Sequence, residues 1–196
     1  MPKFYDLGGV ERGLSWAHGK YKVEFLDAGG GPKFKLVEVW ETTGDASVNV
    51  TVRNAFGAPQ YKQPVAQSWP SLESPSGDLG RLPEGSSKSI WSHRAMYLYT
   101  DTMGHAGFGF GGGAVMHEDG GPLSFWIISP STKSDGLAKV GWDGATDHTC
   151  LGHLVFELVA GDDPDPDPDP DPEPEEKVGF LCRIARFLCP KGWSPK

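Results

Sequence analysis

The stretch from residue 95 to residue 113 constrains the fold of this chain more than any other. It begins with an apolar run from Met96 to Tyr99, continues through a polar turn from Thr100 to Gly104, and ends in a glycine-rich segment carrying Phe108 and Phe110. Short apolar runs bounded by turn residues are typical of β-strands. We therefore predict a β-hairpin here, with its aromatic side chains in a core.

Other segments alternate polar and apolar residues, as a strand with one buried face does. The clearest is Val48 to Arg53, where three valines alternate with Asn, Thr and Arg. This spacing places the valines on one face, toward a core. The same pattern predicts a strand at 20–26 with Tyr21, Val23 and Phe25 on one face. Further strands are predicted at 34–40, 65–69, 151–159 and, almost wholly apolar and therefore central, 123–128.

Glycine and proline make up more than a fifth of the 196 residues, with 27 and 17 copies. Both are poor helix formers, and the predicted strands are short and separated by turns. We therefore expect an all-β domain over residues 20–160, an antiparallel sandwich of seven or more strands without an amphipathic helix. Residues 1–19 are polar and contain glycine, and are expected to form an irregular lead-in.

Residues 161–176 have the composition of a linker, with Asp-Pro repeated five times and followed by Glu-Pro. Proline fixes φ and disfavours helix in the residue before it. Regular alternation of proline with mutually repelling acids predicts an extended spacer of ~3.1 Å per residue. Such a segment buries nothing and separates the parts on either side of it.

Residues 177–196 form a short apolar and basic tail, which we expect to be helical. In a helix Leu181, Ile184 and Leu188 would share one stripe, flanked by Phe180 and Phe187. A helix so short and apolar is not expected to stay alone in water. We expect it to dock on a partner protein, a neighbouring copy or its own body; membrane contact and an end without a role are the alternatives.

The three cysteines bear on this tail. Cys182 and Cys189 are seven residues apart, which in a helix separates their Cα atoms by ~10 Å. A disulfide needs Cα atoms within about 7 Å. Either the tail is a helix with free or intermolecular thiols, or it is a disulfide loop. Cys150, beside the predicted strand at 151–159, is expected to be a buried thiol.

The net charge of −8 is unevenly distributed. Residues 161–176 hold nine acids and residues 177–196 five bases, so residues 1–160 carry 13 basic and 17 acidic residues. A nucleic-acid-binding domain would need a basic face, and we expect no such partner. No apolar run approaches the length of a membrane span. The N-terminus lacks a signal core, so either the chain is not exported by that route or it is part of a longer one.

Tryptophans in or beside predicted loops are the best candidates for a binding site: Trp69, Trp91 and Trp142. Exposed aromatic rings beside polar residues stack on sugar rings. Asp147 and His148 would then bind sugar hydroxyl groups. The alternative is that each tryptophan caps an open end of the sandwich.

Catalytic and cofactor motifs give weaker signals. Residues 107–112 fit the dinucleotide pattern G-x-G-x-x-G literally, but no helix follows them, and the pattern requires one. The cluster Asp143 to His148, with His153 nearby, suggests calcium binding or hydrolase chemistry, yet its spacing matches no metal-site motif. We therefore expect no cofactor, no resident metal and no catalytic residue.

Three patterns together resemble bacterial immunoglobulin-like and carboxypeptidase-regulatory-like modules. They are the alternating strand Val48–Val52, the turn Asn54-x-x-Gly57-x-Pro59, and the segment Thr100-Asp101-x-x-Gly104-x-Ala106-x-Phe108. The resemblance implies a seven-stranded antiparallel immunoglobulin-like (Greek-key) sandwich. It also implies an accessory, spacer or ligand-binding role in extracellular or cell-surface proteins.

These observations lead to one principal hypothesis and two alternatives. The principal one is a non-catalytic binding module of an extracellular or surface system, with a glycan bound by the loop aromatics. The first alternative is a structural subunit of a homo-oligomer whose tail, 177–196, docks on a neighbouring copy. The second is a hydrolase built from loop Asp and His residues.

Overall fold

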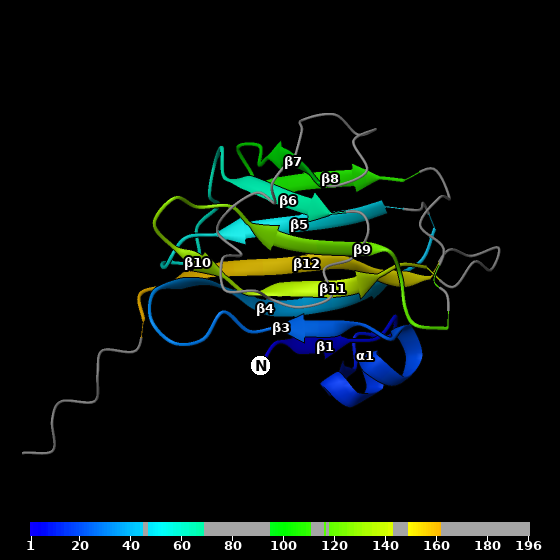
Figure 1. Ribbon diagram of the computed structural model, residues 1–196. Helices are drawn as coiled ribbons and strands as arrows, with labels where there is room; N and C mark the ends of the chain where they lie inside the picture. Colours follow the sequence, from blue (N-terminus) through cyan, green and yellow to red (C-terminus); the bar gives the residue numbers. More distant parts are fainter. Residues whose placement is uncertain (45–46, 69–94, 111–115, 117, 143–148, 162–196) are drawn as a thin grey trace, which may run out of the picture. The chain divides into compact units, whose positions relative to one another are not determined.

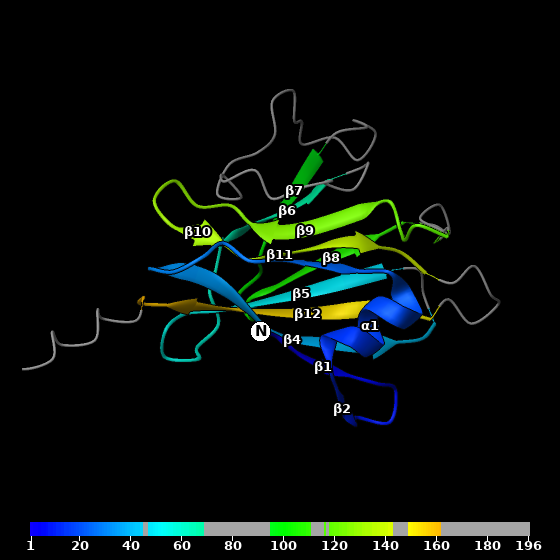
Figure 2. The same cartoon turned by 60° about the horizontal axis from the view of Figure 1, so that its bottom comes forward.

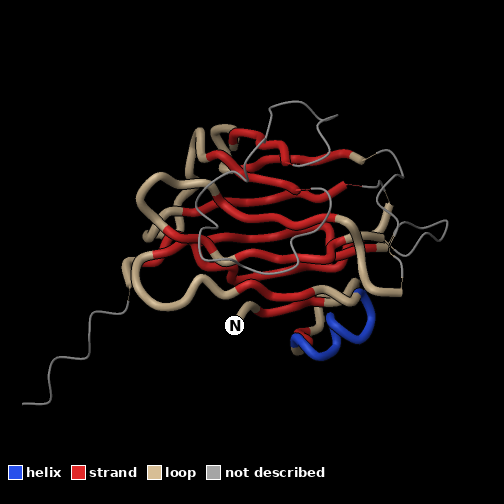
Figure 3. Tube along the Cα trace, viewed as in Figure 1, coloured by secondary structure: helices blue, strands red, loops and turns tan. Residues whose placement is uncertain are grey.

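The computed structural model describes residues 1–44, 47–68, 95–110, 116, 118–142 and 149–161. Figures 1 and 3 show two β-sheets and one helix. The elements are β1 (Lys3–Tyr5), β2 (Glu11–Arg12), α1 (Leu14–Tyr21), β3 (Glu24–Leu26), β4 (Lys33–Thr42), β5 (Ser47–Arg53), β6 (Pro64–Ser68), β7 (Ala95–Tyr99), β8 (His105–Gly109), β9 (Leu123–Ile127), β10 (Lys133–Ser134), β11 (Gly136–Val140) and β12 (Cys150–Val159).

These elements belong to one compact unit, Met1–Asp162, and a second unit comprises Asp163–Lys196. The expected linker at 161–176, apart from Gly161, and the expected tail helix at 177–196 lie outside the described residues. No helix in the described part of the chain is long and apolar enough to cross a membrane.

The larger sheet, sheet A, has the strand order β2-β1-β4-β12-β5-β8, with β10 also paired to β4; the smaller, sheet B, has the order β3-β11-β9-β6-β7. The prediction of an all-β sandwich is confirmed at this level, but the prediction of purely antiparallel sheets is wrong. Strands β1 and β10 run parallel to β4, and β12 runs parallel to β5. For β12 the reason is that it lies between the consecutive strands β4 and β5, which run in opposite directions, so a strand antiparallel to β4 is parallel to β5.

The core lies between the two sheets. All three valines of β5 are fully buried, as the alternation predicted. The rings of Phe108 in sheet A and Phe125 in sheet B meet edge to face, with centroids 5.4 Å apart. Every residue of β9 is buried and β9 is central in sheet B, which confirms that prediction as well. Cys150 is buried as expected.

The two strands in the stretch 95–113 do not form a hairpin, although their approximate positions were predicted correctly. Strand β7 pairs with β6 in sheet B, and β8 pairs with β5 in sheet A. The turn between them crosses from one sheet to the other. Its first residue, buried Thr100, exchanges hydrogen bonds with Gln63 just before β6. Its last residue, Gly104, accepts a 2.8 Å hydrogen bond from Val52 N–H in β5, so each end of the turn is tied to a different sheet.

The first 26 residues also differ from expectation. Residues 1–19 are not an irregular lead-in, because β1 joins sheet A and α1 packs beside it (Figure 2). The strand predicted at 20–26 begins only at Glu24, and Tyr21 is instead the last residue of α1. The sequence signal for α1 is weak because it contains Gly19 and has no side-chain cap at Gly13. Tertiary contacts stabilise α1, chiefly through Tyr21, which is buried.

Candidate binding face on sheet A

The structure does not support the role predicted for Trp142. This side chain is 0% exposed and packs in the core, its ring 5.5 Å from that of Phe110. The backbone of Trp142 pairs with that of Cys150, at the start of β12, in an isolated antiparallel β-bridge. This pairing places Trp142 beside sheet A and not on a loop surface. It therefore has no surface on which a sugar could stack. The other candidates lie outside the described residues: Trp69, Trp91, Asp147, His148, Phe180, Leu181, Ile184, Phe187 and Leu188.

The structure instead aligns polar and aromatic side chains on the outward face of sheet A. Strand pairing places five residues side by side, one from each of five neighbouring strands: Tyr5 (β1), Trp40 (β4), His153 (β12), Asn49 (β5) and Gly107 (β8). Their neighbours along the strands are buried core residues, so this row faces away from the core. We call it the first row.

Two further rows run beside it on the same face. The second row contains Lys3, Glu38, Val155, Thr51 and His105. The third contains Lys35, Glu157 and Arg53. We call the three rows together the binding face.

The aromatic part of the binding face is a pair of stacked rings. The rings of Tyr5 and Trp40 have centroids 4.0 Å apart and an interplanar angle of 16°. Both residues are half-buried. The indole N–H of Trp40 donates a 3.0 Å hydrogen bond to Glu38 Oε2, which fixes the ring and satisfies its only polar atom. The rings therefore present a preorganised apolar surface within a polar face.

His153 lies at the centre of the binding face and is half-buried. Its Nε2 hydrogen-bonds with Thr51 Oγ1 at 2.9 Å. Burial lowers the pKa of His153, and the charges of His105 and Arg53 act in the same direction, against the opposing effect of Glu38. The ring is therefore neutral at physiological pH, and a neutral imidazole has one donor and one acceptor nitrogen.

The binding face is open toward β8. This strand is at the edge of sheet A, and Gly107 and Gly109, two of its three outward residues, carry no side chains. A Cβ atom at Gly107 would lie 3.2 Å from Asn49 Oδ1, so the glycine leaves the exposed Asn49 amide accessible. The sequence contained this signal in the alternation of glycine with Phe108, but it did not show which strand lies beside β8.

The ionised side chains on the face balance one another. Counted together with Glu11 of β2, which is paired with Tyr5 at the edge of the face, the basic and acidic ones are equal in number: Lys3, Lys35 and Arg53 against Glu11, Glu38 and Glu157. Lys3 and Glu11 form an ion pair at 3.1 Å beside Tyr5. Within the described ranges no group of three or more His, Cys, Asp or Glu side chains is placed to hold a metal ion. The face thus suits a ligand with hydroxyl groups and apolar ring surfaces more than an ionic one.

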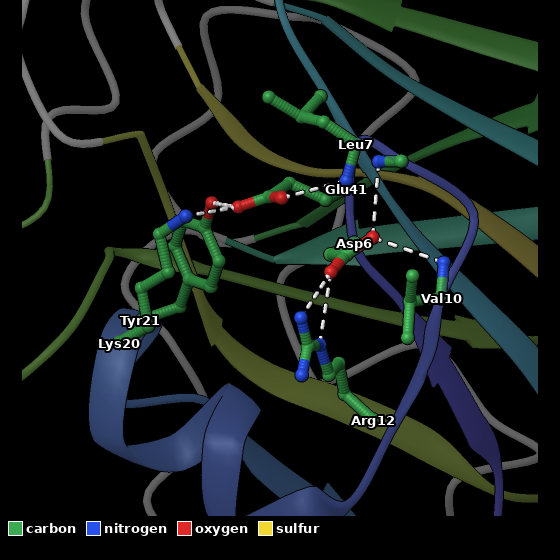
Figure 4. A network of polar contacts seen from close by, with 8 residues as sticks. Asp6, Leu7, Val10, Arg12, Lys20, Tyr21 and Glu41 are labelled. Atoms are coloured by element: carbon green, nitrogen blue, oxygen red, sulfur yellow. Dashed lines mark hydrogen bonds and ion pairs between the residues drawn. The ribbon is translucent and has the colours of Figure 1, made fainter.

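A buried carboxylate holds the segment that brings Tyr5 onto the face (Figure 4). Glu41 accepts hydrogen bonds from the Tyr21 hydroxyl, from Lys20 Nζ and, at 2.8 Å, from Leu7 N–H. In the same segment Asp6 accepts two hydrogen bonds from the Arg12 guanidinium, at 2.9 and 2.7 Å. Together these carboxylates tie β1, β2 and α1 to β4.

Glu41→Gln is expected to destabilise the protein at neutral pH by ~1–3 kcal/mol, because the amide no longer pairs with Lys20 and leaves buried donors poorly satisfied. Burial acts to raise the pKa of Glu41, but the hydrogen bonds from Lys20, Tyr21 and Leu7 outweigh it, and the pKa is lowered. Its stabilisation is therefore present above the ordinary glutamate pKa and is lost as the pH falls through the lowered value. Urea unfolding across this range should show the two proteins converging in acid; a constant difference would contradict the assignment.

Comparison with known proteins provides no relative. No family model, no curated protein and no solved structure matches this chain.

Proposed function

We propose that this chain is a carbohydrate-binding module whose site is the binding face of sheet A. The observation that carries the proposal is the first row, which joins a stacked aromatic pair to neutral hydrogen-bonding groups across five strands. The hydroxyl groups of a pyranose hydrogen-bond to imidazole and amide groups, and its C–H faces pack on aromatic rings. His153 and Asn49 supply the polar contacts next to Trp40.

The dimensions of the first row favour an extended ligand. Neighbouring strands are ~4.8 Å apart, so five strands span about 19 Å, enough for a short oligosaccharide lying across the strands. The missing side chains at Gly107 and Gly109 leave the β8 end open to a longer chain. The balance of charge on the face favours a neutral polysaccharide over an acidic one.

The proposal keeps the class predicted from the sequence but moves the site from the loops to a sheet. The resemblance to immunoglobulin-like modules supports an accessory role in an extracellular or surface system. A turn that crosses between sheets, as at Thr100 to Gly104, is compatible with a Greek-key sandwich, whose connections also link the two sheets.

Trp40→Ala is expected to weaken glycan binding at least ~10-fold, because it removes both the stacking surface and the fixed partner of Tyr5. The full chain is first screened on a glycan array, and affinity electrophoresis in the polysaccharide found there compares the variants. Tyr61→Ala removes an exposed aromatic ring outside the binding face and is the matched control. Full binding by Trp40→Ala, with loss only in Trp69→Ala or Trp91→Ala, would return the site to the loops.

The homo-oligomer remains the alternative proposal, motivated by the apolar stripe in residues 177–196. It requires a multimer that disappears when this tail is deleted, which light scattering measures directly. A monomer before and after deletion would exclude it.

A further inference from the structure

One end of the sandwich gathers exposed apolar side chains. Among the described residues seven large apolar or aromatic side chains are exposed, and four of them lie on two turns or at the adjoining end of β7. Phe56 and Tyr61 are on the turn 54–62, Met103 is on the turn 100–104, and Tyr99 is the last residue of β7. Phe56 is 94% exposed and the other three are each more than half exposed. We call these four residues the apolar end.

The two turns are adjacent and joined by backbone hydrogen bonds. Lys62 N–H donates to Thr100 C=O at 3.1 Å, and Thr100 N–H donates to Gln63 C=O at 3.0 Å. A Cβ atom on Gly104 would lie only 3.2 Å from the Cα of Pro59. Figure 1 shows the turns after β5 and β7 leaving the sheets on the same side. The two turns that carry the apolar end therefore lie side by side.

Each turn is internally fixed by a side chain. Asn54 Oδ1 accepts hydrogen bonds from the N–H groups of Phe56 and Ala58, at 2.9 and 3.0 Å. Asp101 Oδ1 accepts one from Met103 N–H at 2.8 Å. Phe56 and Met103 are thus held near the apices of ordered turns, and burying them requires little further ordering of the backbone.

The charge beside the Tyr61 ring is positive. Within residues 53–62 and 99–104 the charged side chains are Arg53, Lys62 and Asp101, and Arg53 is paired across the strands with Glu157 of β12. Lys62 Nζ lies 5.2 Å from the centroid of the Tyr61 ring. Tyrosine and lysine next to protruding apolar residues match the chemistry of a lipid interface, where apolar tips enter the acyl region and the cation meets phosphate.

We propose that the apolar end is a membrane-contact surface, which inserts Phe56 and Met103 into a bilayer that carries anionic headgroups. The apolar residues protrude from turns, and a bilayer accepts a protruding tip without a matching pocket, whereas a protein partner needs one. The Lys62 cation complements anionic lipid. This inference is independent of the glycan proposal, because it uses none of the residues of the first row.

The membrane-contact proposal is tested by co-sedimentation of the full chain with phosphatidylcholine vesicles, prepared with and without phosphatidylglycerol. The unmodified protein is expected to bind both, and the anionic vesicles more tightly. The double variant Phe56→Ser/Met103→Ser should bind roughly tenfold or more weakly. The Lys62→Gln variant should bind phosphatidylcholine vesicles as the unmodified protein does, and should lose only the tighter binding that phosphatidylglycerol confers. The matched control is Leu7→Ser/Val10→Ser, which removes two exposed apolar side chains from the β1–β2 turn and should bind normally.

Three outcomes would overturn the inference. The first is no binding to either vesicle. The second is binding that the Phe56→Ser/Met103→Ser variant retains, which would place the contact elsewhere, for example in residues 177–196. The third is that the unmodified protein does not bind vesicles but forms a dimer in solution, and that only the Phe56→Ser/Met103→Ser variant abolishes this dimer. The apolar end would then be a protein interface.

Discussion

Gly104→Ala is expected to lower the free energy of unfolding by ~3 kcal/mol or more, the sum of backbone strain and a steric clash. Gly104 has a φ of 75°, in the left-handed region that residues with a Cβ atom rarely adopt. The added Cβ would also lie 2.6 Å from the carbonyl oxygen of Val52, a backbone atom in β5 that cannot move without disturbing the sheet. Urea unfolding of the full chain measures the loss.

Gly57→Ala is the control for this variant. Gly57 has nearly the same φ, 76°, but no atom lies within 4 Å of the Cβ position. The control therefore carries only the conformational strain, which we expect to be ~1–2 kcal/mol. Equal losses in the two variants would show that contact with Val52 does not matter, and would remove the support for a tightly packed crossing between the sheets.

Asp135→Ala is expected to lose ~3–5 kcal/mol of stability, because it removes the buried acceptor of two backbone N–H groups and leaves the largely buried Lys33 amine with only an exposed carboxylate as partner. Asp135 is 1% exposed and lies between β10 and β11. Its carboxylate accepts hydrogen bonds from Ala28 N–H at 3.0 Å and Leu36 N–H at 3.3 Å, and it forms a 2.9 Å ion pair with Lys33. Urea unfolding at neutral pH measures this loss.

The control for Asp135 is the other carboxylate that contacts Lys33. Asp27 forms a 2.7 Å ion pair with the same amine, but its side chain is 62% exposed. Asp27→Ala should therefore change stability by about 1 kcal/mol or less. The double variant Asp135→Ala/Lys33→Met should recover part of the loss, because the Lys33 amine that has lost its buried partner is then absent. Equal effects of the two aspartates would contradict the assigned role of burial.

The pattern of residues within the longer strands, such as β5 and β9, was readable from the sequence, whereas the pairing of strands was not. Alternation correctly placed the valines of β5 in the core and Asn49 on the opposite face. The turn at Thr100 to Gly104 has the composition of a hairpin turn, but hydrogen bonds to Gln63 and Val52 send its two flanking strands into different sheets. Those partners are about 40 to 50 residues away in the chain, and no local pattern records them.

The candidate site could not be predicted from the sequence for the same reason, because it depends on strand pairing. The residues of the first row come from positions as far apart as Tyr5 and His153, and they meet only through the register of five strands. Trp142 was misassigned because it lies beside a predicted loop and not in an alternating strand, yet its backbone pairs with Cys150 and its side chain is buried in the core. Helix α1 was missed because it is stabilised by the contact of Tyr21 with Glu41 and not by its own helix propensity.

The position of β12 between β4 and β5 has a consequence for the order in which the protein assembles during synthesis. Strands β4 and β5 leave the ribosome long before β12, and a direct hairpin between them would occupy the place that β12 needs. Sheet A therefore cannot be completed before residues 150–159 have been synthesised. Contacts between residues so distant in the chain also form slowly during folding. Because β12 also carries His153, the first row is completed only when this late strand is in place, so a chain cut short before β12 cannot display it.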